Sequence, residues 1–167
     1  MFQLVILSIV VATALAGAIM DNKQCGRVFH PDAMRCCQKN SDTIYKLIMS
    51  NDLSECFQEP KDPIKCEREI CIAKKKGFAT DDNKLDKKKL EEIMNKDLGS
   101  DAELLEDVKS KCLNGDFEKY APADFCDFLK MRHCVSMQIL NHCREWNANA
   151  ECQAMKGLVA ECVKIIT

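Results

Sequence analysis

Glycine, proline and tryptophan are scarce in this chain, and neither sign of charge dominates it. Its 167 residues include 6 Gly, 4 Pro and 1 Trp, and 24 Lys and Arg stand against 26 Asp and Glu. With no surplus of positive charge to neutralise phosphates, the chain is not expected to bind nucleic acid. The abundant Leu, Ile, Met, Ala, Lys and Glu favour helices over strands, and we expect an all-α protein.

Common catalytic and metal-binding motifs are also missing. Neither Gly-x-Ser-x-Gly nor His-Glu-x-x-His occurs, and no two cysteines have the Cys-x-x-Cys spacing of many zinc sites. A secreted phospholipase has a catalytic histidine after an adjacent cysteine pair, whereas Cys36 and Cys37 are followed by the run Gln38 to Asn40. We therefore expect no enzyme, no metal site and no cofactor, and we assign no catalytic residues.

An uncharged apolar run opens the sequence, and the first charged side chain is Asp21. The run ends in small residues, and both Ala14-Leu15-Ala16 and Ala16-Gly17-Ala18 fit a signal-peptidase site. A stretch of about twenty residues also has the length of a membrane span, but its small-residue end favours cleavage. We expect residues 1–16, or 1–18, to be a signal peptide, and residues 17–167 to form one secreted, extracellular domain.

Cysteine is the one residue type in clear excess. In a secreted chain an even number of cysteines indicates disulfides before metal ligands, so we expect six bridges. The twelve are Cys25, Cys36, Cys37, Cys56, Cys66, Cys71, Cys112, Cys126, Cys134, Cys143, Cys152 and Cys162.

Apolar residues at helical spacing predict about seven helices in a compact bundle. The first covers residues 41–51. The second has well-marked ends, because Asp62 is a suitable N-cap, Pro63 fits the first helical position, and Gly77 follows three lysines as a C-terminal glycine.

The remaining helices have similar signals. Residues 86–98 carry an apolar stripe that ends before a glycine, and the run Ser100 to Glu103 forms a capping box for the next helix. That helix stops at Asn114. Pro122 begins a longer helix, and the last one starts at about Asn149. No internal repeat and no long linker divides the chain.

The spacing of Cys37, Cys66, Cys71 and Cys112 in a secreted helical chain resembles that of the insect odorant-binding proteins, over nearly the whole mature sequence. The run from Cys66 to Asp86 is similar to the third helix of that family and the turn after it. The additional cysteines and the ending from Cys143 to Cys152 resemble the cysteine-expanded Plus-C branch. The match has departures: four residues, not three, separate Cys66 from Cys71, and Arg144 stands where the branch has proline.

The resemblance implies an interlocked pairing of six cysteines, in one of two registers. In the first, Cys36 or Cys37 joins Cys71, Cys66 joins Cys126, and Cys112 joins Cys134. In the second, Cys66 joins Cys134 and Cys112 joins Cys143. The sequence leaves both open.

The resemblance also implies a function, namely a carrier that encloses a small hydrophobic semiochemical, such as an odorant or pheromone, in an apolar cavity. Its partners would be that ligand and a membrane receptor for delivery, and the carrier would be a monomer or a weak homodimer. The alternative is a secreted interaction or defence protein that uses the same scaffold with a filled core. The candidate ligand-binding residues are the aromatic and methionine side chains of the apolar stripes: Phe57, Phe78, Met94, Phe125, Phe128, Met131 and Met137.

The cysteine count generates a direct prediction. The intact mass of the native mature protein should lie twelve hydrogens below that of the reduced protein, because six bridges oxidise all twelve thiols. Alkylation without reduction, followed by mass spectrometry, measures this difference. Two or more alkylated cysteines in native protein would contradict the six-bridge assignment.

Overall fold

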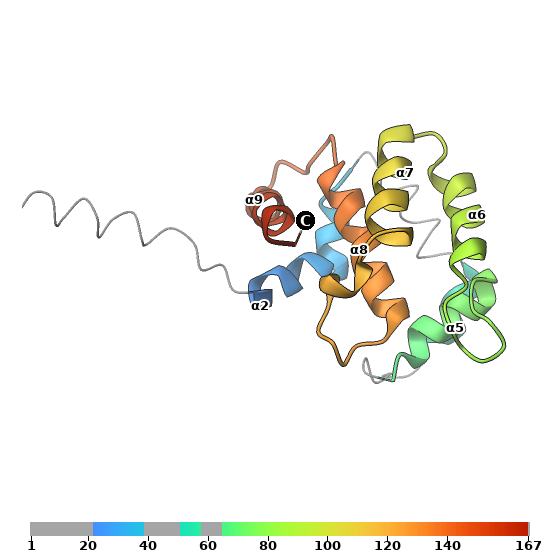
Figure 1. The fold of residues 1–167 in the computed structure, drawn as a ribbon. Coiled ribbons are helices and arrows are strands. Elements are labelled where there is room, and N and C mark those ends of the chain that lie inside the picture. The colour runs from blue at the N-terminus through green and yellow to red at the C-terminus, as the bar shows by residue number, and fades with distance from the viewer. Residues whose placement is uncertain (1–21, 39–50, 58–64, 167) are drawn as a thin grey trace, which may run out of the picture.

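The computed structural model describes residues 22–38, 51–57 and 65–166, and these form an all-α structure held by disulfides (Figure 1). Within these ranges lie six α-helices of five residues or more. They are α3 (Pro31–Arg35), α5 (Glu67–Lys76), α6 (Lys87–Leu98), α7 (Ala102–Val108), α8 (Asp127–Asn141) and α9 (Ala150–Ile166). Shorter segments are α2 (Asn22–Cys25), the 3₁₀ segments η1 (Gly26–Phe29), η2 (Asn51–Phe57) and η4 (Phe117–Tyr120), and the π-helical η3 (Lys109–Leu113).

Three predictions concern residues beyond these ranges. The signal peptide over 1–16 and the start of a helix at Asp62 and Pro63 lie outside the described residues. So does the helix expected over 41–51, except for its last residue, with which η2 begins. The prediction of about seven helices included helices in these regions, so it does not correspond one to one to the six α-helices of the described residues.

Helix α8 is the centre of the fold. Eleven of its 15 residues are buried, and it packs against α5, α7 and α9 as well as α3, η1, η3 and η4 (Figure 1). A helix that is apolar on all sides must be covered on all sides, and the run from Cys134 to Leu140 is buried without interruption. In Figure 1, α9 lies on one side of α8, and α6 and α7 lie on the other.

Three helix ends lie at or next to the residues where the sequence predicted a helix to begin or end. Asp86 caps α6, because its carboxylate accepts a hydrogen bond from the Lys89 amide at 3.0 Å. Asn149 caps α9 in the same way, accepting from the Cys152 amide at 2.7 Å. Gly77 closes α5 with φ at 79°, a left-handed conformation that only glycine adopts without strain.

The starts of α5 and α8 depend on the backbone just before them. Helix α5 begins at Glu67, because Cys66 before it has φ at 54°, which is not a right-handed helical conformation. Helix α8 begins at Asp127 and not at Pro122. The chain makes a turn after Pro122, whose carbonyl accepts a hydrogen bond from the Phe125 amide at 3.0 Å.

The cap of α7 is also one residue away from the expected position. The Asp101 carboxylate, and not the Ser100 hydroxyl, accepts a hydrogen bond from the Leu104 amide at 3.2 Å. The two side chains are neighbours with similar capping strength, so propensity alone does not separate them.

All twelve cysteines are paired, and three of the bridges tie the N-terminal segment to the C-terminal one. Cys25, Cys36 and Cys37 pair in reverse order with Cys162, Cys152 and Cys143. We call these three bridges, together with the paired backbone of residues 36–38 and 145–147, the terminal clasp.

Backbone hydrogen bonds add to the terminal clasp. The Gln38 amide donates to the Glu145 carbonyl at 2.8 Å, and the Asn147 amide donates to the Cys36 carbonyl at 2.8 Å. Cys37 and Trp146 thereby form an isolated antiparallel bridge. The indole of Trp146 is half-buried against the core, and its Nε1 donates to the Cys143 carbonyl at 3.2 Å.

The other three bridges join the central segments. Cys66 pairs with Cys126 and Cys112 pairs with Cys134, as the first of the two expected registers has them. The partner expected for Cys71 was wrong, because Cys71 pairs with Cys56 and not with Cys36 or Cys37. The second register, with its Cys66–Cys134 and Cys112–Cys143 bridges, is also wrong.

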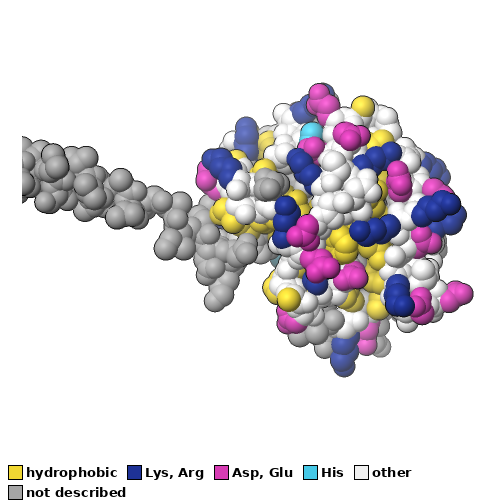
Figure 2. All heavy atoms as spheres, in the orientation of Figure 1, with side chains coloured by type: hydrophobic (Ala, Val, Ile, Leu, Met, Phe, Trp, Pro, Cys, Tyr) yellow, Lys and Arg dark blue, Asp and Glu magenta, His cyan; other side chains and the backbone are white. Residues whose placement is uncertain are grey.

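The surface mixes charges of both signs. Figure 2 shows Lys and Arg interspersed with Asp and Glu over the face that it presents. Some of these charges pair, for example Lys75 with Glu55 at 2.9 Å and Lys89 with Glu92 at 3.0 Å. Among the residues that the structure describes, no helix combines the length and the apolar composition that crossing a membrane requires.

The cap of α7 offers a matched pair of variants. Asp101→Ala should lower the free energy of unfolding by about 1 kcal/mol, because the Leu104 amide loses its hydrogen-bond acceptor. Ser100→Ala should change it by less than about 0.5 kcal/mol. Urea unfolding of the oxidised proteins measures both, and a larger effect at Ser100 would contradict the assigned cap.

Candidate functional site

Part of the predicted ligand-binding set lies in the apolar interior. Met94 of α6 and Met131 and Met137 of α8 belong to one buried cluster, each exposing 3% or less. Met131 and Met137 are six residues apart, so they leave α8 in directions about 120° apart and face different neighbours. The interior is rich in thioether side chains, which adapt to neighbours of different shape.

Two of the predicted aromatic residues meet beside this cluster. Phe128 is buried on the first turn of α8, and Phe78, which follows α5, packs against the core. Their ring centroids are 6.4 Å apart with the planes tilted by 50°, a favourable arrangement for two aromatic rings. They link the chain after α5 to the start of the central helix.

The last two predicted residues lie elsewhere. Phe125 is half-buried in the turn before α8. Phe57 ends η2 with 43% of its surface exposed, and the Arg68 guanidinium lies over its ring, 5.6 Å from the centroid. The structure thus brings Met94, Met131, Met137, Phe78 and Phe128 to the interior or its edge, and places Phe57 at the surface.

A buried polar pair was missed by the sequence reasoning. Gln138 of α8 is 1% exposed and Tyr120 of η4 is 2% exposed, and Gln138 Nε2 donates to the Tyr120 hydroxyl at 3.1 Å. Burial raises the pKa of Tyr120, although its hydrogen bond with Gln138 acts in the opposite direction. The phenol therefore stays neutral and is able to donate as well as accept. The available signal was a glutamine within the mainly apolar stretch from Cys134 to Leu140.

His133 connects the buried pair of Tyr120 and Gln138 to the N-terminal segment. Its ring stacks on that of Phe29 in η1, with centroids 4.1 Å apart and planes 4° apart, and its Nδ1 lies 3.2 Å from the Tyr120 carbonyl oxygen. Burial, together with the positive charge of Arg132, lowers the pKa of His133 to about 4, against the weaker opposing effect of that hydrogen bond. The neutral imidazole is therefore the form that the fold accommodates, with Nδ1 donating to the carbonyl.

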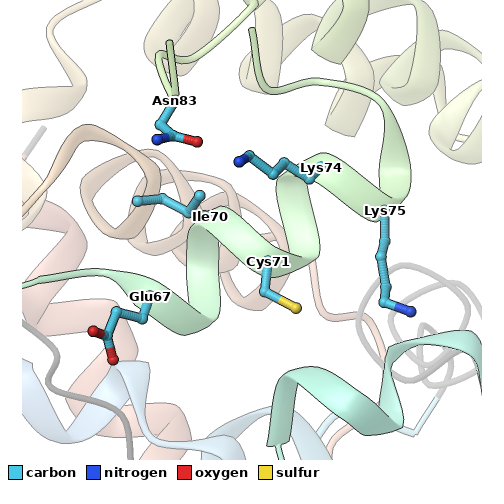
Figure 3. A pocket seen from close by; sticks show the side chains of 6 residues that line it. All are labelled: Glu67, Ile70, Cys71, Lys74, Lys75 and Asn83. Atoms are coloured by element: carbon cyan, nitrogen blue, oxygen red, sulfur yellow. The ribbon is translucent and has the colours of Figure 1, made fainter. Parts of the chain in front are cut away.

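An open hollow of about 500 Å³ lies on the outer face of α5 (Figure 3). Ile70 and Cys71 form its apolar part, while Lys74 and the Asn83 amide point toward each other above Ile70. The remaining lining residues, Glu67 and Lys75, lie toward its two ends. None of the predicted ligand-binding residues lines this hollow.

Comparisons with known proteins add no assignment. No model of a protein family matches the chain, and neither a curated protein nor a solved structure matches it significantly. Within the described residues, no three His, Cys, Asp or Glu side chains come together in a way that would hold a metal ion.

His133 makes stability depend on pH in a defined direction. Its folded pKa of about 4 lies below the usual 6.5, so between these values the folded protein binds fewer protons than the unfolded chain. The contribution of His133 is complete above pH 6.5 and is lost progressively as the pH falls to 4, amounting to about 3 kcal/mol. His133→Gln should flatten the dependence of unfolding free energy on pH across this window.

A matched control is His30→Gln, because the side chain of His30 is 65% exposed. Urea unfolding at pH 4.0, 5.0, 6.0 and 7.0 compares the two variants with the unaltered protein. Equal pH dependence in all three proteins would show that His133 is not the responsible group.

Proposed function

We propose that the protein is a secreted carrier of small, mainly apolar molecules of the odorant or pheromone type, related to the insect odorant-binding proteins. The observation on which this rests most heavily is the order of its central disulfides. Six successive cysteines pair first with third, second with fifth and fourth with sixth: Cys56, Cys66, Cys71, Cys112, Cys126 and Cys134.

That order is the interlocked pairing that the family resemblance implies, with Cys56 in the place expected for Cys36 or Cys37. Six cysteines allow fifteen complete pairings, so agreement with one implied order is informative. The three bridges of the terminal clasp are additional, which agrees with the cysteine-expanded Plus-C branch.

The interior has the chemistry that such a carrier needs. Met94, Met131 and Phe128 provide adaptable apolar contacts, and the buried pair of Tyr120 and Gln138 offers a hydrogen bond that would orient a hydroxyl or carbonyl group. Binding would be driven by apolar area removed from water, at about 25 cal/mol per Å².

Secretion is supported by the six bridges, since disulfides persist in oxidising compartments and are rare in the cytosol. The apolar run before Asp21 would then be the signal that directs export. A carrier in an extracellular fluid needs resistance to unfolding more than it needs a catalytic centre, and long-range bridges provide this resistance.

The proposal predicts reversible binding of an apolar fluorescent probe. N-phenyl-1-naphthylamine should bind to delipidated, oxidised protein with a Kd near the micromolar level, about −8 kcal/mol, and be displaced by uncharged ten-to-fifteen-carbon compounds. Phe128→Ala should weaken probe binding about tenfold and also lower stability, by about 3–5 kcal/mol.

Leu129→Ala is the control, because Leu129 is as deeply buried on α8 as Phe128 but points to a different face. It should lower stability comparably while leaving probe affinity within about threefold, with both affinities measured on fully folded protein. If the unaltered protein binds neither the probe nor any co-purifying small molecule, the interaction or defence protein with a filled core becomes the better interpretation.

A further inference from the structure

Among the residues that the structure describes, positive charge exceeds negative charge where the start of α5 meets α8. The carboxylate of Glu69, only 8% exposed, lies 3.4 Å from Nη1 of Arg132 on α8. Arg68, the neighbour of Glu69, forms no ion pair within the described part of the chain, and its buried Nε has no hydrogen-bond partner there. Two guanidinium cations are thus accompanied by one buried carboxylate.

Both cations neighbour Glu69: Arg68 precedes it on α5, and Arg132 contacts its carboxylate from α8. Burial lowers the pKa of Arg132, Glu69 opposes this, and the positive charge of Arg68 lowers it further. At 3.4 Å the contact between Glu69 and Arg132 is longer than a strong charge-assisted hydrogen bond, so this carboxylate does not satisfy the donors of Arg132 fully. A second anion would relieve the repulsion between the two cations.

The surroundings of Arg68 are apolar on one side. Its guanidinium lies over the ring of Phe57, whose exposed fraction of 43% is large for an aromatic side chain. A cation beside an exposed aromatic ring suits a molecule that carries an anionic group and an apolar portion together. An inorganic anion would contact the guanidinium group and leave the aromatic ring uncovered.

A disulfide fixes the geometry of this region. Cys66, directly before α5, is bridged to Cys126, directly before α8, with their Cα atoms 6.1 Å apart. Arg68 follows Cys66 by two residues, and Arg132 stands in the second turn of α8. The two guanidinium groups are therefore attached to helix starts that are covalently joined, which limits the entropy that binding would cost.

We propose that Arg68 and Arg132 bind the carboxylate of a small organic acid, with the apolar chain of that acid lying on Phe57. A carboxylate presents two oxygens to the planar N–H donors of guanidinium groups, and its charge balances the second cation. The site is at the surface and is separate from the methionine-rich interior. It does not depend on the carrier function proposed above.

The test is an NMR titration of the oxidised protein that follows the Nε–H signals of its arginines. Decanoate should shift the signals of Arg68 and Arg132 and bind at least tenfold more tightly than acetate, which has no apolar chain. Decanol, with the chain and no carboxylate, should leave both signals in place. Equal shifts with decanol, or binding of sulfate or acetate as tight as that of decanoate, would overturn the proposal.

Substitutions test whether Arg68 is responsible for the binding of decanoate. Arg68→Gln should weaken decanoate binding at least tenfold, and Arg68→Lys should weaken it less, because the charge remains without the planar donors. Arg144→Gln is the control, since Arg144 is exposed and paired with Glu103 at 3.6 Å, and it should change affinity less than twofold. Equal affinity for decanoate in Arg68→Gln and the unaltered protein would also overturn the proposal.

The variant Phe128→Ala separates this site from the interior. It should leave the decanoate-induced shift of Arg68 unchanged while weakening the apolar fluorescent probe. Loss of both in Phe128→Ala, in protein shown to be folded, would contradict a separate surface site. Absence of probe binding with an intact response of Arg68 would instead count against the carrier function alone.

Discussion

Helix α8 carries apolar side chains around its whole circumference, so it is stable in water only when other segments cover each of its faces. Segments from both ends of the described chain supply this cover, from α3 and η1 to α9. These contacts join residues that are far apart in sequence, so forming them costs conformational entropy. The disulfides reduce that cost by keeping the covering segments close to α8 in the unfolded chain.

The terminal clasp illustrates how the bridges share this task. Cys37 and Cys143 are 106 residues apart, and a loop of about this length corresponds to about 4.7 kcal/mol in the chain-entropy model. Once the neighbouring Cys36–Cys152 bridge has formed, the Cys37–Cys143 bridge closes only a short ring. The first bridge of the clasp therefore contributes most of the entropy term, and the others fix the register of residues 36–38 against 145–147.

The sequence predicted features that depend on local chemistry better than those that depend on tertiary contacts. The helix starts next to Asp86 and Asn149 and the glycine end at Gly77 depend on local sequence, and the structure has all three. The start of α8 at Asp127 and the pairing of Cys71 with Cys56 were not predicted, because a proline such as Pro122 suits a turn as well as a helix start, and twelve cysteines offer many possible partners. For the candidate site, residue type indicated several interior side chains, but the partners of polar residues on α8 were not evident.

The ion-pair and hydrogen-bond partners of the polar residues on α8 determine how the surrounding segments are arranged, because apolar burial has no preferred direction. Arg132 is paired with Glu69 of α5, whereas His133 and Gln138 both bind Tyr120 of η4. Helix α6 is different: Leu90, Met94 and Leu98 join the core, and its Lys87 donates to the Leu113 carbonyl of η3 at 2.9 Å. In the proposed carrier, the apolar part of a ligand beside Met94 would displace adaptable side chains and would not need to break the ion pair of Arg132 or the contact of His133 with Tyr120. For the carrier function that we propose, the α6 side of the core is therefore the place where an apolar ligand would cost the least free energy to accommodate.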